Sequence, residues 1–529
     1  MSSNLVSLRL KDIPWQKHAE KVVVGKDILE LLSSSMYLDP MTIYREYVQN
    51  AADSIDDART RGLLKSREEG VIDIACDATS RTIRILDNGT GIPSRSFIRR
   101  LTSFGASAKR GSTARGFRGV GRLAGLGYCQ ELIFRSRATG EPKVNELRWD
   151  CRKIRSALRS NDFTGDLNEI VNEAVEFRQI SIQDWPLRFF EVELRGVIRH
   201  RDDRLLNHIA IEGYLGQVAP VPFDKEFRFA DEITAFLRSK VSLADLQISV
   251  NGRSPIRRPH RDRIEISESV VDEFRRVEMF EIPGSDGSAC AVGWILHHGY
   301  VGALPQRSNM RGFRIRSGDI QVGGENLLEE LFPEVRFNTW SVGEIHILDK
   351  RIVPNGRRDH FEQNIHFDNL LNHVAPYARE IARQCRLNST RRRWQREFET
   401  AQADAEHFIH VLKQSAVPAK QRSKYMSQIQ IRIGHMEKLS DLQDADRPEG
   451  GTFREALDAL RRRVAKLDQG KSQSDGPLSI LPHDKRRAYE EVLGLIYECS
   501  LNPAAARALV ERIIAKVTET GTPKPTKVN

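Results

Sequence analysis

The segment from Tyr44 to Ala58, YREYVQNAADSIDDA, brings three polar side chains to one side of a predicted helix. Glu46, Asn50 and Asp53 stand at positions i, i+4 and i+7, and residues at these spacings project from one helix face. Such a face suits a magnesium nucleotide: Asn50 can hold the metal among phosphate oxygens, and Glu46 can orient an attacking water. A solvated polar helix face explains the same triplet, so this pattern needs support from elsewhere in the chain.

The residues around this segment predict helices followed by a hairpin. Residues 27–60 carry apolar side chains at helical spacings, and the Asp39-Pro40 pair divides them into two helices. Val71–Cys76 and Thr82–Leu86 alternate, are rich in β-branched residues and are joined by a turn-prone segment. Glu131–Arg137 and Phe189–Arg195 are predicted to be further strands, so the first 200 or so residues mix helices with a sheet.

A second polar motif directly follows the second hairpin strand. It reads Asp87-Asn88-Gly89-Thr90-Gly91-Ile92. A carboxylate at a strand end can accept a hydrogen bond from an exocyclic amine, which would select adenine, and the two glycines allow a close turn past the base. An ordinary Asp-Asn-Gly turn remains the alternative interpretation.

A third motif is rich in glycine. Gly116-Phe117-Arg118-Gly119-Val120-Gly121 is preceded by Ser103-Phe104-Gly105-Ala106-Ser107-Ala108-Lys109 and followed by a predicted helix from about Arg122. Glycines at this spacing expose successive backbone N–H groups, and a helix N-terminus favours an anion, so the motif predicts a phosphate cradle. It is not a P-loop, because no Gly-Lys-Ser/Thr follows, and no strand precedes it as in a Rossmann fingerprint.

The order and spacing of the three motifs resemble the N, G1 and G2 boxes of the GHKL superfamily, which includes gyrase B, Hsp90, histidine kinases and MutL-like proteins. The segment ILELLSSSMYLDPMTIYREYVQNAADSID looks most like the first helices of Hsp90, and GFRGVGRLAGLG looks like a blend of the Hsp90 and MutL glycine loops. The resemblance covers about residues 18 to 220.

This resemblance implies a role for each matching residue. Glu46 would be the catalytic carboxylate, Asn50 the Mg²⁺ ligand, Asp53 an acid lining the pocket and Asp87 the residue that reads adenine. Ser103–Arg115 would form a lid over the nucleotide. The implied ATP-binding residues are Asn50, Asp53, Asp87, Gly89, Gly91, Ile92, Lys109, Gly116, Phe117, Gly119, Val120 and Gly121. The threonine that these families usually carry on a later strand has no match in Arg188–Leu194, so that strand receives no assignment.

A second match lies near the end of the following domain. VPNGRRDHFEQN, residues 353–364, resembles the Hsp90 middle-domain loop that presents an arginine to the γ-phosphate of ATP. By position Arg358 would be this catalytic arginine, and Arg357 is its rival. A cation delivered in this way offsets charge that develops on the transferred phosphoryl group. A solvent-exposed basic turn is the alternative interpretation.

The fold class expected from these patterns is α+β. Residues 1–220 would form a GHKL, or Bergerat-type, α/β sandwich ATPase domain. Residues 221–365 would form a second α/β domain resembling ribosomal protein S5, with helices at Phe229–Lys240 and Asn326–Leu331. Residues 366–529 are helical in pattern, with flexible joints near 446–452 and 469–477.

Composition sets broader limits on the protein's class. The 529 residues include 82 basic and 72 acidic ones, a net charge of +10, and the basic clusters 391–393, 461–463 and 485–487 lie in helices that also bear acids. No apolar run approaches the roughly 20 residues of a membrane span, and no secretory signal is visible, so we expect a cytoplasmic protein. The six cysteines are far apart and are expected to be reduced and mostly buried, while His297 and His298 are expected to be structural.

Together these expectations describe an ATPase that hydrolyses Mg-ATP to open and close on a client protein, in the manner that the Hsp90 resemblance implies. A homodimer formed through the helical region is a further possibility. Two alternatives stay open. A MutL-like or MORC-like clamp would use the same ATPase to enclose DNA, and an ATP-gated scaffold would bind nucleotide with little turnover.

Overall fold

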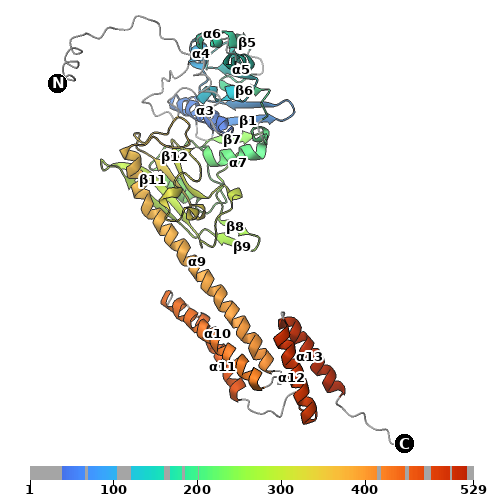
Figure 1. Cartoon of the computed structure of the whole chain (residues 1–529). Coiled ribbons are helices and arrows are strands. Elements are labelled where there is room, and N and C mark those ends of the chain that lie inside the picture. Colours follow the sequence, from blue (N-terminus) through green and yellow to red (C-terminus); the bar gives the residue numbers. More distant parts are fainter. Residues whose placement is uncertain are drawn as a thin grey trace, which may run out of the picture. The chain divides into compact units, whose positions relative to one another are not determined.

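The structure is a computed structural model that describes residues 39–65, 69–103, 121–159, 167–181, 185–199, 202–413, 419–446, 452–469, 478–500 and 503–520. The predicted nucleotide-loop residues Lys109, Gly116, Phe117, Gly119 and Val120 lie outside the described residues, as does most of the predicted lid. The chain divides into two units, Met1–Cys385 and Arg386–Asn529. Each unit is described by itself (Figure 1).

Helix α3 (Thr42–Thr60) carries the polar triplet, and most of its residues are buried. It begins just after the predicted Asp39-Pro40 break, where the Asp39 side chain accepts a hydrogen bond from the Met41 amide at 3.0 Å. It ends at Thr60, and Gly62, two residues further on, has a φ of +68°, which suits a residue without a Cβ. Its apolar residues at helical spacing, including Tyr47, Val48 and Ile55, are buried in the main core of this unit.

A seven-stranded sheet supports α3. Its strands are β1 (Val71–Asp77), β2 (Thr82–Asp87), β3 (Glu131–Arg137), β4 (Val144–Asp150), β5 (Val175–Ile180), β6 (Phe189–Arg195) and β7 (Gln247–Val250), in the order β5-β4-β3-β6-β2-β1-β7. The predicted hairpin is β1 and β2, with Ile74 opposite Ile85. Strand β7 pairs in parallel with β1, so this sheet includes residues later than 220. The sequence patterns placed a boundary between domains at residue 220.

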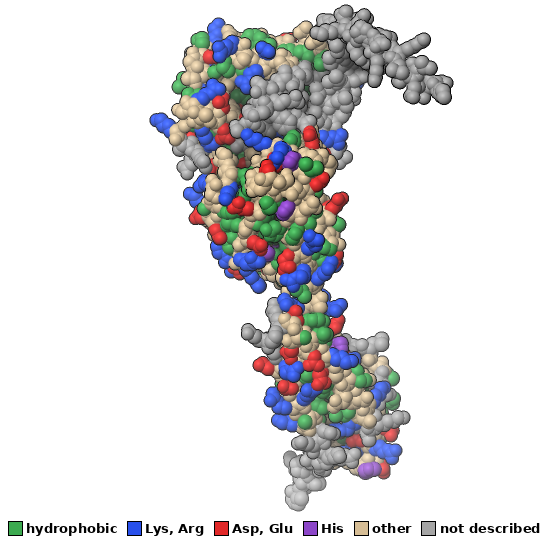
Figure 2. Space-filling view, turned by 90° about the vertical axis from the view of Figure 1, so that its left-hand side faces the viewer, with side chains coloured by type: hydrophobic (Ala, Val, Ile, Leu, Met, Phe, Trp, Pro, Cys, Tyr) green, Lys and Arg blue, Asp and Glu red, His purple; other side chains and the backbone are tan. Residues whose placement is uncertain are grey.

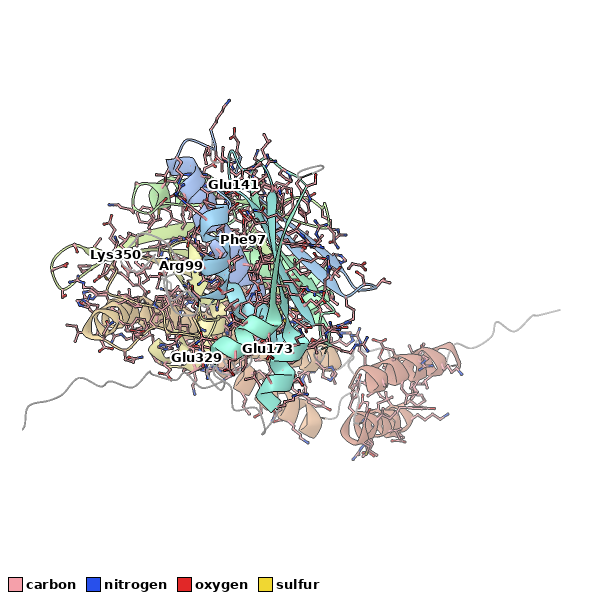
Figure 3. All side chains as sticks on the ribbon, turned by 90° about the horizontal axis from the view of Figure 1, so that it is seen from above. Phe97, Arg99, Glu141, Glu173, Glu329 and Lys350 are labelled. Carbon is pink, nitrogen blue, oxygen red and sulfur yellow. The ribbon has the colours of Figure 1, made fainter. Side chains whose placement is uncertain are left out.

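Helices cover one face of this sheet and share its core. They are α3, α4 (Ser94–Thr102), α5 (Cys151–Arg159), α6 (Leu167–Ala174) and α7 (His208–Val218), with the 3-10 segments η2 (Gly121–Gly127) and η3 (Arg204–Leu206). Phe97 and Arg99, labelled on α4 in Figure 3, illustrate the division of a helix into two sides. Phe97 is buried near Phe177 of β5, whereas Arg99 is exposed. The result is the expected sandwich of one helical layer on one sheet.

The second sheet of this unit has five strands. They are β10 (Arg276–Pro283), β11 (Ala289–His297), β12 (Gly312–Ser317), β13 (Ile320–Val322) and β14 (Val342–Ile347), in the order β10-β11-β14-β12-β13. One apolar cluster on this sheet includes α8 (Ala230–Arg238), and another includes the first turns of α9 (Ile365–Lys413). Strands β8 (Arg263–Ser267) and β9 (Val270–Glu273) form a separate hairpin. Short 3-10 segments lie at η4 (Gln306–Ser308) and η6 (Val335–Trp340).

One element near this sheet differs from the expectation. Asn326–Leu331 was predicted to be a helix, but only the 3-10 turn η5 (Glu329–Leu331) forms there. Gly323 and Gly324 precede the segment and Pro333 follows it, so few residues remain to offset the cost of helix nucleation.

His297 and His298 have structural contacts, as expected. His298 is buried with Nδ1 2.7 Å from an Asp272 carboxylate oxygen and Nε2 2.7 Å from the Trp340 carbonyl oxygen. His297 contacts Glu278 and Tyr300. No group of three or more His, Cys, Asp or Glu side chains able to hold a metal occurs in the described part of the chain.

The helical unit contains the rest of α9, together with α10 (Ala419–Asp446), α11 (Thr452–Gln469), α12 (His483–Cys499) and α13 (Pro503–Thr520). Helices α9, α10 and α11 share one apolar core, and α12 and α13 share a smaller one. Basic and acidic side chains alternate on the face of this unit shown in Figure 2. The basic clusters are paired with acids, as Arg391 with Asp446, Arg463 with Glu406 and Arg486 with Glu490 illustrate.

Two further expectations concern the whole chain. Among the described helices, none is both long enough and apolar enough to cross a membrane. All six cysteines are free thiols; four are buried, Cys76 is half-buried and Cys499 is exposed.

A buried group of charges lies in the second sheet. The Glu344 carboxylate pairs with Arg258 and, at 2.8 Å, with Arg316. Arg258 also pairs with Asp319 at 2.9 Å. Burial alone would raise the pKa of Glu344, but Arg258 and Arg316 hold it well below its ordinary value. Removing one member therefore leaves uncompensated charge in the interior.

We expect Glu344→Ala to lower the free energy of unfolding by about 3–5 kcal/mol, because two buried arginines lose their shared partner. Urea unfolding followed by circular dichroism measures this change. Glu265→Ala is the control, because Glu265 forms an exposed pair with Arg307, and its loss should cost at most about 1 kcal/mol. Equal unfolding midpoints for the two variants would contradict the prediction.

Candidate functional site

The polar face of α3 lies against the first residue of η2. Glu46 is only 5% exposed, Asp53 is also buried, and Asn50 between them is half-buried. A Cβ on Gly121 would lie 2.2 Å from the Glu46 carboxylate oxygen Oε2, so the Glu46 side chain would have to move to make room for it. Gly121 therefore brings the backbone at the end of the glycine-rich motif into contact with the predicted catalytic carboxylate.

Asp87 is buried at the end of β2, where the resemblance places the residue that reads adenine. Its carboxylate is 4% exposed and accepts a hydrogen bond from the Gly89 amide at 2.9 Å. Burial raises the pKa of Asp87 to about 7, against the opposing effects of the Gly89 amide, Arg188 and Ser54. A carboxyl group in this environment can hold a proton or accept a hydrogen bond from a ligand.

The two glycines of this motif are required by close contacts. A Cβ on Gly89 would lie 2.2 Å from Ser54 Oγ, so the turn packs directly on α3. Gly91 has a φ of +66°, and a Cβ there would lie 2.2 Å from the Arg137 carbonyl oxygen at the end of β3. The Ile92 amide donates a hydrogen bond to Ser136 Oγ at 2.7 Å. These contacts hold the motif across the ends of neighbouring strands.

Asn88 has a structural task within the same motif. Its Oδ1 accepts a hydrogen bond from the Val71 amide at 2.9 Å, and its Nδ2 donates to the Glu69 carbonyl at 2.5 Å. The side chain thereby joins the end of β2 to the start of β1. The motif can therefore be both a turn and a ligand site, because Asn88 makes the structural hydrogen bonds and Asp87 is the predicted ligand residue.

Ser54 and Tyr47 belong to the site's framework and were missed from the sequence. Ser54 Oγ accepts a hydrogen bond from the Thr90 amide at 3.0 Å. Tyr47 OH accepts one from the Gly125 amide of η2 at 2.9 Å. Ser54 stands four residues after Asn50, so helical spacing is a signal that could have found it. Tyr47 is indistinguishable in sequence from an ordinary core aromatic.

The loop that was predicted to present an arginine is a closed turn within the first unit. Its ends are joined by the bridge between Pro354 and Phe361 and by a hydrogen bond from the Glu362 amide to the Val353 carbonyl at 2.8 Å. At its tip Arg358 is buried, with a φ of +57°, and its Nε lies 3.7 Å from Glu46 Oε1. Arg357 is exposed. The structure thus brings Arg358, and not Arg357, to the carboxylate of Glu46.

Arg45 attaches this loop to α3 and was also missed. Its Nη1 donates to the Arg358 carbonyl at 3.2 Å, and its Nη2 donates to the Arg357 carbonyl at 3.0 Å. Nη2 also lies 3.4 Å from Glu46 Oε1. Glu46 consequently has two guanidinium groups beside it, one from its own helix and one from the loop.

The predicted residues that are described meet around two contacts. The first contact is at Glu46 of α3, the helix that also carries Asn50 and Asp53; Gly121 and Arg358 lie beside Glu46. The second contact is at Ser54 of the same helix, on which the end of β2 packs with Asp87, Gly89, Gly91 and Ile92. Mg²⁺ binds through few protein oxygens and keeps phosphate and water as its other ligands, and the Asn50 amide oxygen, on the same helix as Glu46, would supply one protein ligand.

Comparisons with known proteins found one matching family and several relatives. Residues 41–176 match the family described as histidine kinase-, DNA gyrase B- and HSP90-like ATPase. Chaperone protein HtpG of Polaromonas naphthalenivorans is 23% identical over 274 residues, which cover 45% of this chain and 42% of that protein. Chaperone protein HtpG of Chromobacterium violaceum is 26% identical over 279 residues, covering 48% and 40%.

A shorter match reaches a higher identity. Chaperone protein HtpG of Baumannia cicadellinicola is 30% identical over 145 residues, 24% of this chain and 22% of that protein. The chain thus spans about two fifths of the length of the first two relatives. Residues 41–176 thus resemble an ATPase domain of the GHKL superfamily, and the chain is similar to the chaperone proteins named HtpG.

Proposed function

We propose that the chain binds Mg-ATP between α3 and the Asp87–Ile92 turn and hydrolyses it to ADP and phosphate. The observation that carries this proposal is the 3.7 Å contact between Glu46 and Arg358, which come from opposite ends of the first unit's sequence. A carboxylate able to orient water and a cation able to stabilise phosphoryl charge are the two groups that hydrolysis of a phosphoanhydride needs at one place.

In this mechanism each residue has a distinct task. Asp87 accepts a hydrogen bond from the adenine amine, and Gly121, which has no side chain, leaves room for phosphates beside α3. Magnesium, held in part by Asn50, would neutralise phosphate charge. Glu46 orients the attacking water, and Arg358 offsets the charge that develops on the γ-phosphoryl oxygens. Before ATP arrives, Glu46 and Arg358 partly neutralise each other.

We further propose that this hydrolysis drives conformational opening and closing on a client protein. Similarity to HtpG supports this proposal, and the helical unit would supply the contacts to a client or to a second copy of the chain. A DNA clamp is less well supported, because the three basic clusters pair with neighbouring acids. A scaffold with little turnover would keep its function when Glu46 is removed, whereas an ATPase would lose it.

Glu46→Ala should retain ATP binding and lose hydrolysis by roughly 10²–10⁴-fold, the usual contribution of a positioned general base. Steady-state phosphate release measures turnover, and calorimetry at equilibrium measures binding. Full turnover by Glu46→Ala would contradict the proposed role. If Glu46→Ala loses turnover but still acts on its client as wild type does, the chain is an ATP-gated scaffold.

Arg358→Ala should lower kcat by about 10³-fold, in the range of arginines that contact a transferred phosphoryl group. Arg357→Ala is the matched control, because it removes the neighbouring, exposed guanidinium of the same loop and should change kcat by less than about twofold. The assignment fails if Arg357→Ala loses as much activity as Arg358→Ala.

Asp87 should make stability depend on pH in the absence of nucleotide. Its folded pKa of about 7 exceeds the ordinary value near 4, so the folded state binds more protons between these pH values. Stability from this group is therefore present at low pH and is lost as pH rises through 7, by at most about 1.4 kcal/mol per pH unit. Urea unfolding of wild type and Asp87→Asn between pH 5 and 8 isolates the effect.

The expected result is a difference in unfolding free energy, wild type minus Asp87→Asn, that decreases from pH 5 to about pH 7 and levels off above it. A difference that stays constant over this range would show that Asp87 is already ionised at pH 5. Asp87→Asn should also bind ATP much more weakly, because its neutral amide oxygen is a weaker acceptor for the adenine amine than a carboxylate oxygen.

A further inference from the structure

The loop of residues 353–364 that carries Arg358, here called the arginine loop, has a second anchor besides Arg45. The Arg358 carbonyl accepts a hydrogen bond from the Gly323 amide at 2.9 Å as well as the one from Arg45 Nη1. Gly323 directly follows β13, the edge strand of the second sheet. The backbone of the loop tip is therefore held between α3 and this strand end.

The contact at Gly323 leaves no room for a side chain. Gly323 has a φ of +69°, and a Cβ there would lie 2.8 Å from the Asp359 carbonyl oxygen and 3.0 Å from the Leu327 side chain. Both the backbone angle and the close approach require glycine. The position of Gly323 consequently sets the position of the loop tip within a narrow range.

Gln321 holds Gly323 through a buried side chain. Its Nε2 donates a hydrogen bond to the Gly323 carbonyl at 3.0 Å, and its Oε1 accepts one from Arg314 Nη1 at 3.1 Å. Both ends of the buried amide are thus used, one toward the loop anchor and one toward a cation on β12. A buried amide with both ends bonded has little freedom to rotate.

Arg314 extends the connection to the helical layer of the ATPase domain. The same Nη1 donates to Gln217 Oε1 at 2.9 Å, in the last turn of α7. The Gln217 carbonyl also accepts a hydrogen bond from Arg316 Nη2 at 2.6 Å. Helix α7 contacts α3, which carries Glu46. A continuous set of hydrogen bonds therefore runs from α7 through Arg314, Gln321 and Gly323 to Arg358.

We propose that Gln321 is a positioning residue for ATP hydrolysis: clamped by Arg314 to Gln217 of α7, it holds Gly323 and thereby fixes the distance of Arg358 from Glu46. This inference rests on the proposed function, since it assigns Gln321 to the same reaction. If Gln321 served only stability, its substitution would affect folding, nucleotide binding and turnover to the same extent whether or not Arg358 is present.

The test is Gln321→Met, which keeps the length of the side chain and removes both hydrogen bonds. We expect ATP affinity to stay within about twofold and the single-turnover rate of hydrolysis to fall about tenfold, because Arg358 loses its fixed position. In an Arg358→Ala background the same substitution should have no further effect on the rate. Val292→Ala, a core substitution in β11 within the other apolar cluster of this sheet, controls for a general loss of stability.

Amide hydrogen exchange tests the anchor without depending on turnover. Gln321→Met should speed exchange at the amides of Gly323, Asn355 and Glu362, while the amides of β11 and β14 keep their wild-type rates. Gly323→Ala should produce the same pattern and serves as the second variant if Gln321→Met does not fold.

The outcomes separate the two claims. If wild type hydrolyses no ATP, the proposed function fails. Independently of turnover, an amide exchange rate at Gly323 that is the same in Gln321→Met as in wild type would overturn the positioning role. If wild type is active but the losses from Gln321→Met and Arg358→Ala multiply, Gln321 does not act through Arg358 and the inference fails. Loss of the Gln321 effect in the Arg358→Ala background, with faster exchange at Gly323, supports it.

Discussion

The contact between the Glu46 carboxylate and the guanidinium groups of Arg45 and Arg358 is the interaction on which the site depends. A buried carboxylate is costly unless cations or hydrogen bonds compensate for its lost hydration. One compensating group comes from α3 itself, and the other comes from a loop that follows the second sheet. One group of charges thus joins α3, which packs on the first sheet, to the loop that follows the second sheet, and a ligand that carries its own charge there would change the balance among these charges.

Much of this site follows from sequence, because its residues lie close together along the chain. Helical periodicity puts Glu46, Asn50 and Asp53 on one face, and a strand that ends at Asp87 has to turn at Gly89. The β1–β2 hairpin and the strands β3 and β6 could be predicted for the same reason, since alternation and turn residues are local signals.

Other features depend on contacts between distant residues. Arg45 binds the carbonyl of a residue 313 positions later, and nothing in its own neighbourhood indicates this. The choice between Arg357 and Arg358 depends on which way a closed turn presents its tip, where Arg358 adopts a positive φ that a sequence pattern does not reveal. Strand β7 joins the first sheet by pairing with β1, so that sheet extends past residue 220, and the boundaries expected at 220 and 365 stay predictions. The short Asn326–Leu331 segment has a helical pattern but too few residues to form a helix.

The most direct test of the account is calorimetric titration of the wild-type chain with Mg-ATP and, separately, with Mg-GTP. The account predicts one ATP bound per chain and much weaker binding of GTP, because guanine places a carbonyl where adenine offers Asp87 an amine. Absence of ATP binding, or equal affinity for the two nucleotides, would contradict the claim that α3 and the Asp87–Ile92 turn form an adenine nucleotide site.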